Sequence, residues 1–351
     1  MKPEHGGDWW RFEGELIDFS SNLNPLGPPD LLIELLTRSC ARRDYERYPD
    51  PSYRELRERI SSFLNVDQDE VVVLNGATEG IYLIPRVLRP RVAILTPPSF
   101  SEYWHVSTIE GIEIREVPLR RSDDRYKLDV DEVKREVKRL EDKSSILFIC
   151  NPNNPTGSCL KLEEVEEVVS SSGERTFVVI DESFIDFSSE RSAVKLASEG
   201  ENVIVLRSFT KVFSVPGLRM GFLVSNEEVS RKVDLAGPTW RVNSLAERCF
   251  RELLERKGYV ERFLARSKEY SKREMSRVRA EVSKLGFMAY RSSANFLLVE
   301  LSGGLSSREL KLRLIKRYRI LIRDASTFPG LDEKYVRIGL RRKEENDILL
   351  R

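Results

Sequence analysis

Short apolar runs alternate with longer helical patterns through the first two thirds of the chain. Residues 128–141 and 162–172 carry apolar side chains at helical spacing. The continuous apolar runs that predict buried strands are residues 71–74, 92–95, 146–150, 177–181 and 203–208. Because strands and helices alternate, we expect an α/β fold in which helices cover both faces of a large, mainly parallel sheet.

The pattern changes after about residue 240. A charged stretch from residue 245 to 285 has helical spacing, and strand-like runs follow at 295–301, 320–323 and 335–340. This order predicts a smaller α+β domain. We therefore expect an N-terminal arm (1–29) outside both cores, a large domain (30–240) and a small C-terminal domain (241–351).

Charge and hydropathy exclude several classes of function. The 351 residues include 58 Lys and Arg against 57 Asp and Glu, a net charge of +1. A nucleic-acid binder would carry an excess of basic residues, so we expect none, and we interpret the basic stretch 311–319 as a solvated helix face. No apolar run approaches the ~20 residues that span a bilayer. The N-terminus lacks the apolar core of a signal peptide, so we expect a soluble, cytoplasmic protein with no membrane partner.

Metal and thiol chemistry are also poorly supported. The chain has two histidines, His5 and His105, which excludes a multi-histidine metal centre. Its four cysteines form no C-x-x-C pair, and small buried thiols in a reducing compartment are the simplest interpretation. We expect no metal.

Polar motifs follow four of the predicted strands. They are residues 75–80, 151–157, 181–183 and 207–219. Parallel sheets bind ligands at the carboxyl ends of their strands, so these motifs are expected to meet at one site. A lysine such as Lys211 can form a Schiff base in a partly dry site. An acid such as Asp181 can keep a heterocyclic nitrogen protonated, as pyridoxal phosphate requires to act as an electron sink.

The same motifs offer groups for a phosphate. Ser208, Thr210 and Arg219 bring hydroxyls and a guanidinium, and residues 75–80 open a helix whose N-terminus suits an anion. Lys211 precedes Arg219 by eight residues and follows Asp181 by thirty. In these motifs and spacings the chain resembles the aspartate-aminotransferase fold type (fold type I) of pyridoxal-phosphate enzymes over nearly its whole length.

The resemblance implies roles for individual residues. Lys211 is implied to be the Schiff-base lysine and the proton donor to the substrate, and Asp181 the catalytic partner of the pyridine nitrogen. Tyr48 is implied to reach the phosphate of a neighbouring subunit, and thus a homodimer. The residues implied to bind the cofactor in the same chain are Ala77, Thr78, Phe100, Asn154, Asp181, Ser208, Thr210, Lys211 and Arg219.

Within this fold type the chain is similar to two enzyme families, the threonine-phosphate decarboxylases and the histidinol-phosphate aminotransferases. The arm with His5-Gly6-Gly7, Phe184 in place of a tyrosine, and the loop 321–331 resemble the decarboxylases. Without the resemblance, Arg323 and Arg337 would be ordinary outward-facing residues of alternating strands. The substrate contacts that the resemblance implies are His5, Gly6, Asn22, Asn154, Arg323 and Arg337.

The expected activity is therefore pyridoxal-phosphate-dependent decarboxylation of O-phospho-L-threonine to (R)-1-amino-2-propanol O-2-phosphate, for cobalamin biosynthesis. The alternative is histidinol-phosphate aminotransferase, which transfers an amino group to 2-oxoglutarate. A regulator that only senses the cofactor is a third interpretation, but it would need a DNA-binding module that we do not expect. The sequence does not distinguish phosphothreonine from phosphoserine, because one methyl group contributes only ~1–3 kcal/mol to binding in a pocket.

Overall fold

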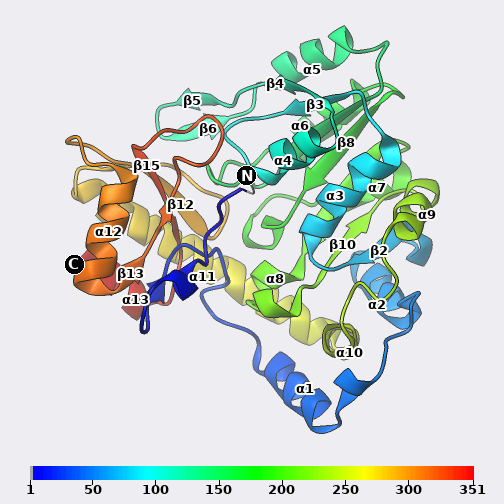
Figure 1. Cartoon of the computed structure of the whole chain (residues 1–351), viewed down its shortest axis with the longest axis horizontal. Helices are drawn as coiled ribbons and strands as arrows, with labels where there is room; N and C mark the ends of the chain where they lie inside the picture. Colours follow the sequence, from blue (N-terminus) through cyan, green and yellow to red (C-terminus); the bar gives the residue numbers. More distant parts are fainter. Residues whose placement is uncertain (1–2) are drawn as a thin grey trace.

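A large sheet forms the centre of the molecule in the computed structural model, which describes residues 3–351 (Figure 1). Within those residues its strand order is β2-β10-β9-β8-β7-β3-β4, and β10 alone runs antiparallel to its neighbours. The strands are β2 (Val71–Leu74), β3 (Val92–Leu95), β4 (Glu113–Glu116), β7 (Ser145–Cys150), β8 (Thr176–Asp181), β9 (Val203–Ser208) and β10 (Gly221–Val224). The predicted α/β class and mainly parallel sheet are confirmed.

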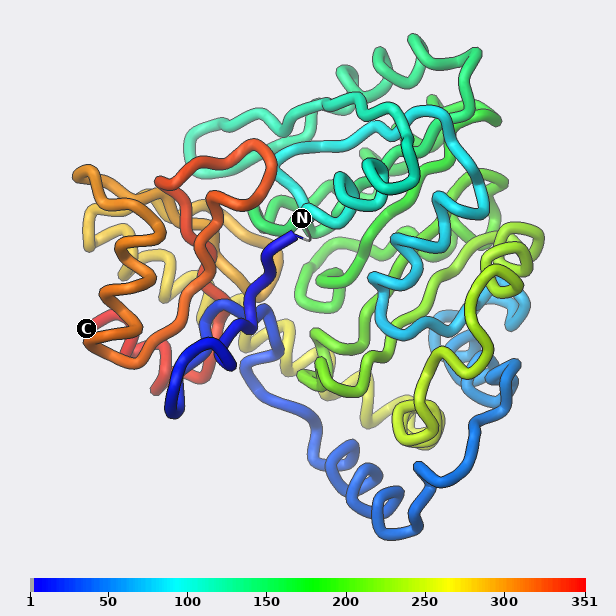
Figure 2. The backbone as a smooth tube through the Cα atoms, viewed as in Figure 1, coloured from blue at the N-terminus to red at the C-terminus, as the bar shows by residue number. Residues whose placement is uncertain are grey.

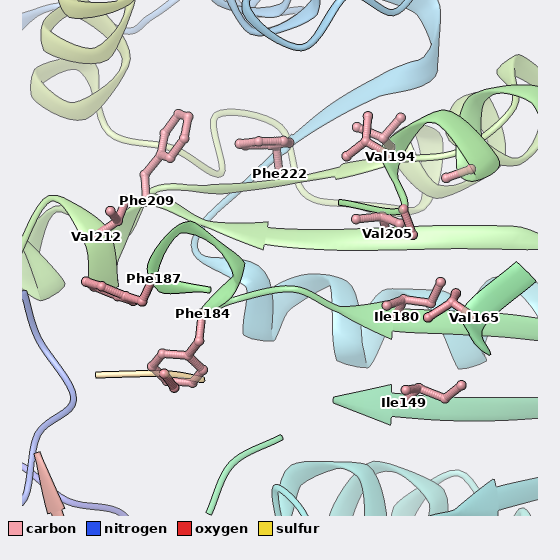
Figure 3. Close-up of a cluster of buried hydrophobic side chains, with 14 of the residues drawn as sticks. Ile149, Val165, Ile180, Phe184, Phe187, Val194, Val205, Phe209, Val212 and Phe222 are labelled. Atoms are coloured by element: carbon pink, nitrogen blue, oxygen red, sulfur yellow. The ribbon is translucent and has the colours of Figure 1, made fainter. Parts of the chain in front are cut away.

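Alternate side chains of the central strands enter two different cores. Val71 and Val73 of β2 belong to one core, and Val72 and Leu74 belong to the other. Figure 3 shows part of the first core, with Ile149, Ile180 and Val205 on the adjacent strands β7, β8 and β9. Because both faces of these strands are buried, each strand appears in the sequence as an unbroken apolar run.

Helices cover both faces of the sheet, as expected. On the second core pack α3 (Ala77–Leu88), α4 (Glu102–Ile109) and α9 (Glu227–Ala236). On the first core pack α1 (Asp30–Ala41), α2 (Arg54–Leu64), α5 (Val130–Arg139), α6 (Leu162–Ser170), α7 (Val194–Glu199), α8 (Phe209–Val212) and α10 (Ser244–Leu254). Across the described part of the chain, every helix is too short or too polar to cross a membrane.

The predicted helical stretch 245–285 consists of two helices, α10 and α11 (Lys257–Lys284), separated by a turn at residues 255–256. The break lets α10 pack on α1 and α2 while α11 packs on β11 and α13. In the described residues a four-stranded antiparallel sheet follows in the order β11-β12-β15-β14. The elements are β11 (Met288–Ala289), β12 (Phe296–Glu300), α12 (Ser307–Tyr318), β13 (Ile320–Leu321), β14 (Arg323–Asp324), β15 (Tyr335–Gly339) and α13 (Lys343–Leu350).

The N-terminal segment lies against this C-terminal part of the chain (Figure 2). β1 (Ile17–Asp18) pairs in parallel with β13. Phe19 is fully buried in a third core with residues of α11, β12 and β15. The expectation that residues 1–29 lie outside both cores is therefore wrong at Phe19, because pairing with β13 carries this side chain inside. The domain boundaries at residues 29 and 240 stay a prediction.

Short elements connect these layers. The hairpin of β5 and β6 extends from the large sheet. These short elements are η1 (Trp9–Arg11), η2 (Asp44–Glu46), η3 (Gln68–Glu70), β5 (Arg120–Ser122), β6 (Arg125–Lys127), η4 (Ile185–Phe187) and η5 (Pro216–Leu218).

Candidate active site

A cavity of about 770 Å³ opens at the carboxyl ends of β2, β7, β8 and β9 and is closed on its other side by the N-terminal segment, β14 and β15. Nearly every site residue predicted from the sequence lines this cavity, and Tyr48 is the exception. The predicted residues that line it are His5, Gly6, Asn22, Ala77, Thr78, Phe100, Asn154, Asp181, Ser208, Thr210, Lys211, Arg219, Arg323 and Arg337. Their individual roles stay predictions.

Lys211 lies in α8, directly after β9, and its side chain is half-buried in the cavity. Burial, together with the positive charges of Arg337 and Arg219, lowers the pKa of Lys211 to about 8, and Asp181 opposes this shift. Within residues 3–351 its Nζ atom makes no hydrogen bond and no ion pair. The amine is thus accessible, and a far larger share of it is unprotonated near neutral pH than the ordinary pKa of 10.5 would allow, which favours its action as a nucleophile.

Asp181 ends β8 and is buried. Its Oδ1 accepts hydrogen bonds from the backbone N (3.0 Å) and Oγ (2.6 Å) of Ser183, and its Oδ2 accepts one from Tyr103 Oη at 2.8 Å. Burial raises the pKa of Asp181, and these hydrogen bonds and Lys211 act in the opposite direction. A carboxylate oxygen has two lone pairs, so Oδ2 can accept one further hydrogen bond from a donor in the cavity.

The phosphate cradle predicted from the sequence is assembled around Gly76, which precedes α3. Gly76 has φ +78°, and a Cβ at this position would lie 2.5 Å from Arg219 Nη2. The same nitrogen donates to the carbonyl of Asn75 at 3.4 Å. Ser208 Oγ and Thr210 Oγ1 are 2.6 Å apart at the N-terminus of α8. A guanidinium, two hydroxyls and a helix N-terminus meet here, a combination that suits a phosphate.

Arg323 and Arg337 are directly opposite each other on the antiparallel strands β14 and β15. Both are buried, with 3% and 5% of their surface exposed. Arg337 donates to Asn154 Oδ1 (2.5 Å) and to the carbonyl of Ser20 (2.7 Å), while Arg323 donates to the carbonyl of Glu4 and to Thr327 Oγ1 (2.5 Å each). Among the described residues neither guanidinium forms an ion pair.

Two buried cations in register repel each other unless an anion joins them. Burial, and then Arg323, lower the pKa of Arg337 to about 9, and burial lowers the pKa of Arg323. Arg337 Nε and Asn22 Oδ1 are also buried without a hydrogen-bond partner in residues 3–351. The unpaired Arg337 Nε–H is a donor that suits an anionic ligand, whereas Asn22 Oδ1 is an acceptor that needs an N–H or O–H donor.

The N-terminal segment closes the cavity beside Phe100. His5 Nε2 lies 2.5 Å from Glu102 Oε1, and its ring centroid lies 5.4 Å from that of Phe100. Gly6 approaches the Ser20 carbonyl so closely that a Cβ would lie 2.1 Å from the oxygen. Sequence analysis missed Glu102, because its partner lies 97 residues away in the chain.

Tyr103 was missed in the same way. It lies three residues after the predicted Phe100 and is fully buried, with its ring centroid 4.9 Å from that of Phe148. Tyr103 therefore orients Asp181 from beneath the cavity. The sequence does show a tyrosine in the first turn of a helix that follows a buried strand. Only the fold connects this tyrosine to Asp181, however, so its role could not be predicted.

Two further predicted residues have simple surroundings. Tyr48 is 78% exposed and stacks on Trp240 with ring centroids 4.4 Å apart, outside the cavity. Its reach to a neighbouring subunit stays a prediction. Phe184 lines the cavity and packs edge-to-face on Phe296, 5.0 Å away.

Comparison with known proteins gives the class of the chain. It matches the family described as "Aminotransferase class I and II" over residues 14–351, and it belongs to this family. Its cofactor is pyridoxal 5′-phosphate, as expected from the resemblance. The residues present fit that group, because an accessible amine, a buried carboxylate and a glycine-bordered phosphate cradle surround one cavity.

Relatives with two different activities match at similar identity. The adenosylcobalamin biosynthesis bifunctional protein CobDQ of Leptospira interrogans is 33% identical over 98% of this chain, which spans only 40% of that protein's length. Threonine-phosphate decarboxylase of Salmonella typhimurium is 30% identical (96% of this chain, 90% of that protein). Histidinol-phosphate aminotransferase of Methanococcus aeolicus is 31% identical (95% and 87%).

Solved structures give the same picture. Histidinol-phosphate aminotransferase of Clostridium acetobutylicum has a TM-score of 0.85 and 28% identity, covering 95% of this chain and 97% of its own. L-threonine-O-3-phosphate decarboxylase of Porphyromonas gingivalis has a TM-score of 0.83 and 26% identity with the same coverage. The fold and family are thus shown, and both activities occur among the relatives.

Proposed function

We propose that the protein decarboxylates O-phospho-L-threonine to (R)-1-amino-2-propanol O-2-phosphate, a step in cobalamin biosynthesis. The bond between Cα and the carboxylate breaks, carbon dioxide leaves, and a proton takes its place on Cα, so no oxidant or amino acceptor is consumed. The relatives named for this decarboxylase and for cobalamin biosynthesis support the proposal.

The observation that carries the proposal is the pair of buried arginines, Arg323 and Arg337. The substrate carries a carboxylate and a phosphate at the same time, so it can neutralise both guanidiniums. Each charge-assisted hydrogen bond gained is worth ~1.5–3 kcal/mol, which makes such a ligand specific for a site with two unpaired cations. The planar fork of arginine also fixes the direction in which an oxyanion is held.

Orientation then decides which bond to Cα breaks. When bound, the cofactor supplies an electron sink for the pair left on Cα as carbon dioxide departs. Asp181 would keep the ring nitrogen protonated, Arg337 would orient the carboxylate, and Lys211 Nζ would return a proton to Cα. Phe184 offers no hydroxyl to the cavity, in agreement with the resemblance to decarboxylases.

Histidinol-phosphate aminotransferase is the second candidate, favoured by relatives of equal identity and by a structure with a TM-score of 0.85. Its amino acceptor, 2-oxoglutarate, has two carboxylates, so the arginine pair could serve it as well. The acceptor is the discriminating feature, because only the aminotransferase requires one.

The test is carbon dioxide release from O-phospho-L-threonine by the purified, cofactor-loaded protein without any keto acid. Release over many turnovers is expected, together with loss of release in the Lys211→Ala variant. L-Threonine and O-phospho-L-serine, as parallel substrates, measure the need for the phosphate and the methyl group. No release, combined with conversion of the cofactor to its amine form by histidinol phosphate, would refute the decarboxylase and support the aminotransferase.

A homodimer is part of the same proposal. The exposed aromatic pair of Tyr48 and Trp240 lies outside the cavity of its own chain, where it could serve a second copy. Size-exclusion chromatography with light scattering measures the oligomeric state, and a monomer at working concentration would contradict this part.

A further inference from the structure

Glu102 is a carboxylate in a cavity that also presents the cationic side chains of Arg219, Arg323 and Arg337. Its side chain is 8% exposed, and each of its oxygens has a different partner. Oε1 lies 2.5 Å from His5 Nε2, and Oε2 accepts a hydrogen bond from Tyr82 Oη at 2.5 Å. The three residues come from the N-terminal segment, α3 and α4, and all three line the cavity.

An uncompensated carboxylate at this place would repel an anionic substrate. Burial raises the pKa of Glu102, but the hydrogen bonds from His5 and Tyr82 outweigh burial and leave that pKa below its ordinary value. Glu102 is therefore ionised, and its Oε1 can accept the Nε2–H of His5. With a doubly protonated imidazole, the His5–Glu102 pair adds an N–H donor to the cavity without adding net charge.

The other ring nitrogen of His5 is left for a ligand. Nδ1 makes no hydrogen bond to any residue of the range 3–351. The backbone around it is held on both sides, because Arg323 donates to the Glu4 carbonyl and the N–H of Gly7 donates to Ser20 Oγ. The ring can turn little while Nε2 is bound to Glu102, so the direction of Nδ1 is set by the pair.

We propose that Glu102 is a positioning residue that holds the imidazole of His5 so that its Nδ1–H binds the phosphate of the substrate. Tyr82 serves the pair by fixing the second oxygen of Glu102. This inference rests on the proposed function, since it takes the phosphoamino acid as the ligand. It starts from the substrate contact that the resemblance implies for His5 and adds the part played by Glu102 and Tyr82.

The inference predicts a characteristic pH dependence. A doubly protonated imidazole donates from both ring nitrogens and a neutral one from only one of them, so KM is expected to rise with pH. The phosphate itself gains its second charge near pH ~6, which acts in the opposite direction and equally in every variant. The titratable and charged groups of this neighbourhood are Glu102 and His105 on α4, Tyr82 on α3, Arg323 on β14, and Glu4 and Asp8 on the segment of His5.

The decisive variant is Glu102→Gln, which keeps the size of the side chain and removes its charge. We expect KM for O-phospho-L-threonine to rise roughly tenfold, as for loss of one charge-assisted hydrogen bond, with kcat changed less than about twofold. The rise of KM with pH should be present in the wild type and should disappear in His5→Gln. Tyr82→Phe, which removes only the second contact of Glu102, should give a smaller change of the same kind.

Glu116→Gln is the matched control. Glu116 is an exposed carboxylate on β4 that accepts a hydrogen bond from Trp104 Nε1 at 2.6 Å, outside the cavity. It should leave kcat, KM and the pH profile unchanged. The cofactor absorbance and thermal unfolding of each variant establish that it is folded and loaded.

A Glu102→Gln variant that matches Glu116→Gln in KM and pH profile would overturn the inference. A loss confined to kcat would overturn it too, because Glu102 would then act on the cofactor rather than on phosphate binding. Calorimetric titration of the holoenzyme with inorganic phosphate separates this inference from the proposed function. If the wild-type protein releases no carbon dioxide, the function fails, while weaker phosphate binding in Glu102→Gln alone still supports the inference and equal binding refutes it.

Discussion

The substitution Gly76→Ala tests the phosphate cradle at its narrowest point. Gly76 has φ +78° and ψ 154°, a region of backbone conformation that is essentially restricted to glycine. An alanine Cβ there would lie 2.5 Å from Arg219 Nη2 and 3.0 Å from Arg219 Cζ. The arginine must therefore move away from the N-terminus of α3, or the backbone must leave its observed conformation.

Each of the two effects has an expected magnitude. Backbone strain of this kind costs ~1–3 kcal/mol, which should appear as a lower free energy of unfolding of the apoprotein. Displacing Arg219 removes a charge-assisted hydrogen bond to the phosphate, worth ~1.5–3 kcal/mol. The dissociation constant of pyridoxal phosphate should therefore increase about tenfold to a hundredfold.

The assay is titration of the apoprotein with pyridoxal phosphate, followed by absorbance, beside denaturant unfolding of the same apoprotein. Gly217→Ala is the matched control, because a Cβ at Gly217 meets nothing within 4 Å and the residue lies in the helical turn η5 next to Arg219. It should leave both quantities unchanged. A Gly76→Ala protein that binds the cofactor as tightly as the wild type would refute the cradle and the placement of the phosphate at Arg219.

Two further predictions concern the charges of the cavity. The rate at which pyridoxal phosphate attaches to the apoprotein should rise with pH around a midpoint of about 8, because only the unprotonated amine of Lys211 attacks. Stopped-flow absorbance measures this rate. A midpoint near 10.5, the ordinary pKa of lysine, would contradict a buried, cationic site. Arg337→Lys keeps the charge, but a single ammonium cannot replace the forked guanidinium that reaches both Asn154 and Ser20. The value of kcat/KM for O-phospho-L-threonine should therefore fall roughly tenfold to a hundredfold, while the affinity for the cofactor stays unchanged. The control is Arg341→Lys, whose arginine precedes α13 and pairs with Glu345 of that helix. Equal kinetics for the two variants would remove Arg337 from substrate binding.

The sequence alone determined the large sheet in detail. The runs 71–74, 92–95 and 203–208 coincide with β2, β3 and β9, because strands buried on both faces must be apolar at every position. It also determined where the site lies. Parallel strands end at one edge of the sheet, so the motifs that follow β2, β7, β8 and β9 meet there whatever the loops do.

Elements of the C-terminal part were predicted less well. The run 320–323 is divided between β13, which pairs with β1, and β14, which pairs with β15. The helical stretch breaks after Leu254 although its apolar spacing continues. In both cases the local pattern is compatible with a single strand or helix. The segment is divided because its two halves pack against different partners that are distant in the sequence.

The tertiary structure alone decided which side chains act together. His5 contacts Glu102 across 97 residues, and Tyr103 supports Asp181 across 78. Arg323 and Arg337 became a pair of neighbouring buried cations only through the register of β14 and β15. Local sequence records the preference of each residue for helix, strand or turn, whereas a hydrogen bond between distant side chains depends on how the packed elements are positioned, and no local pattern specifies that position.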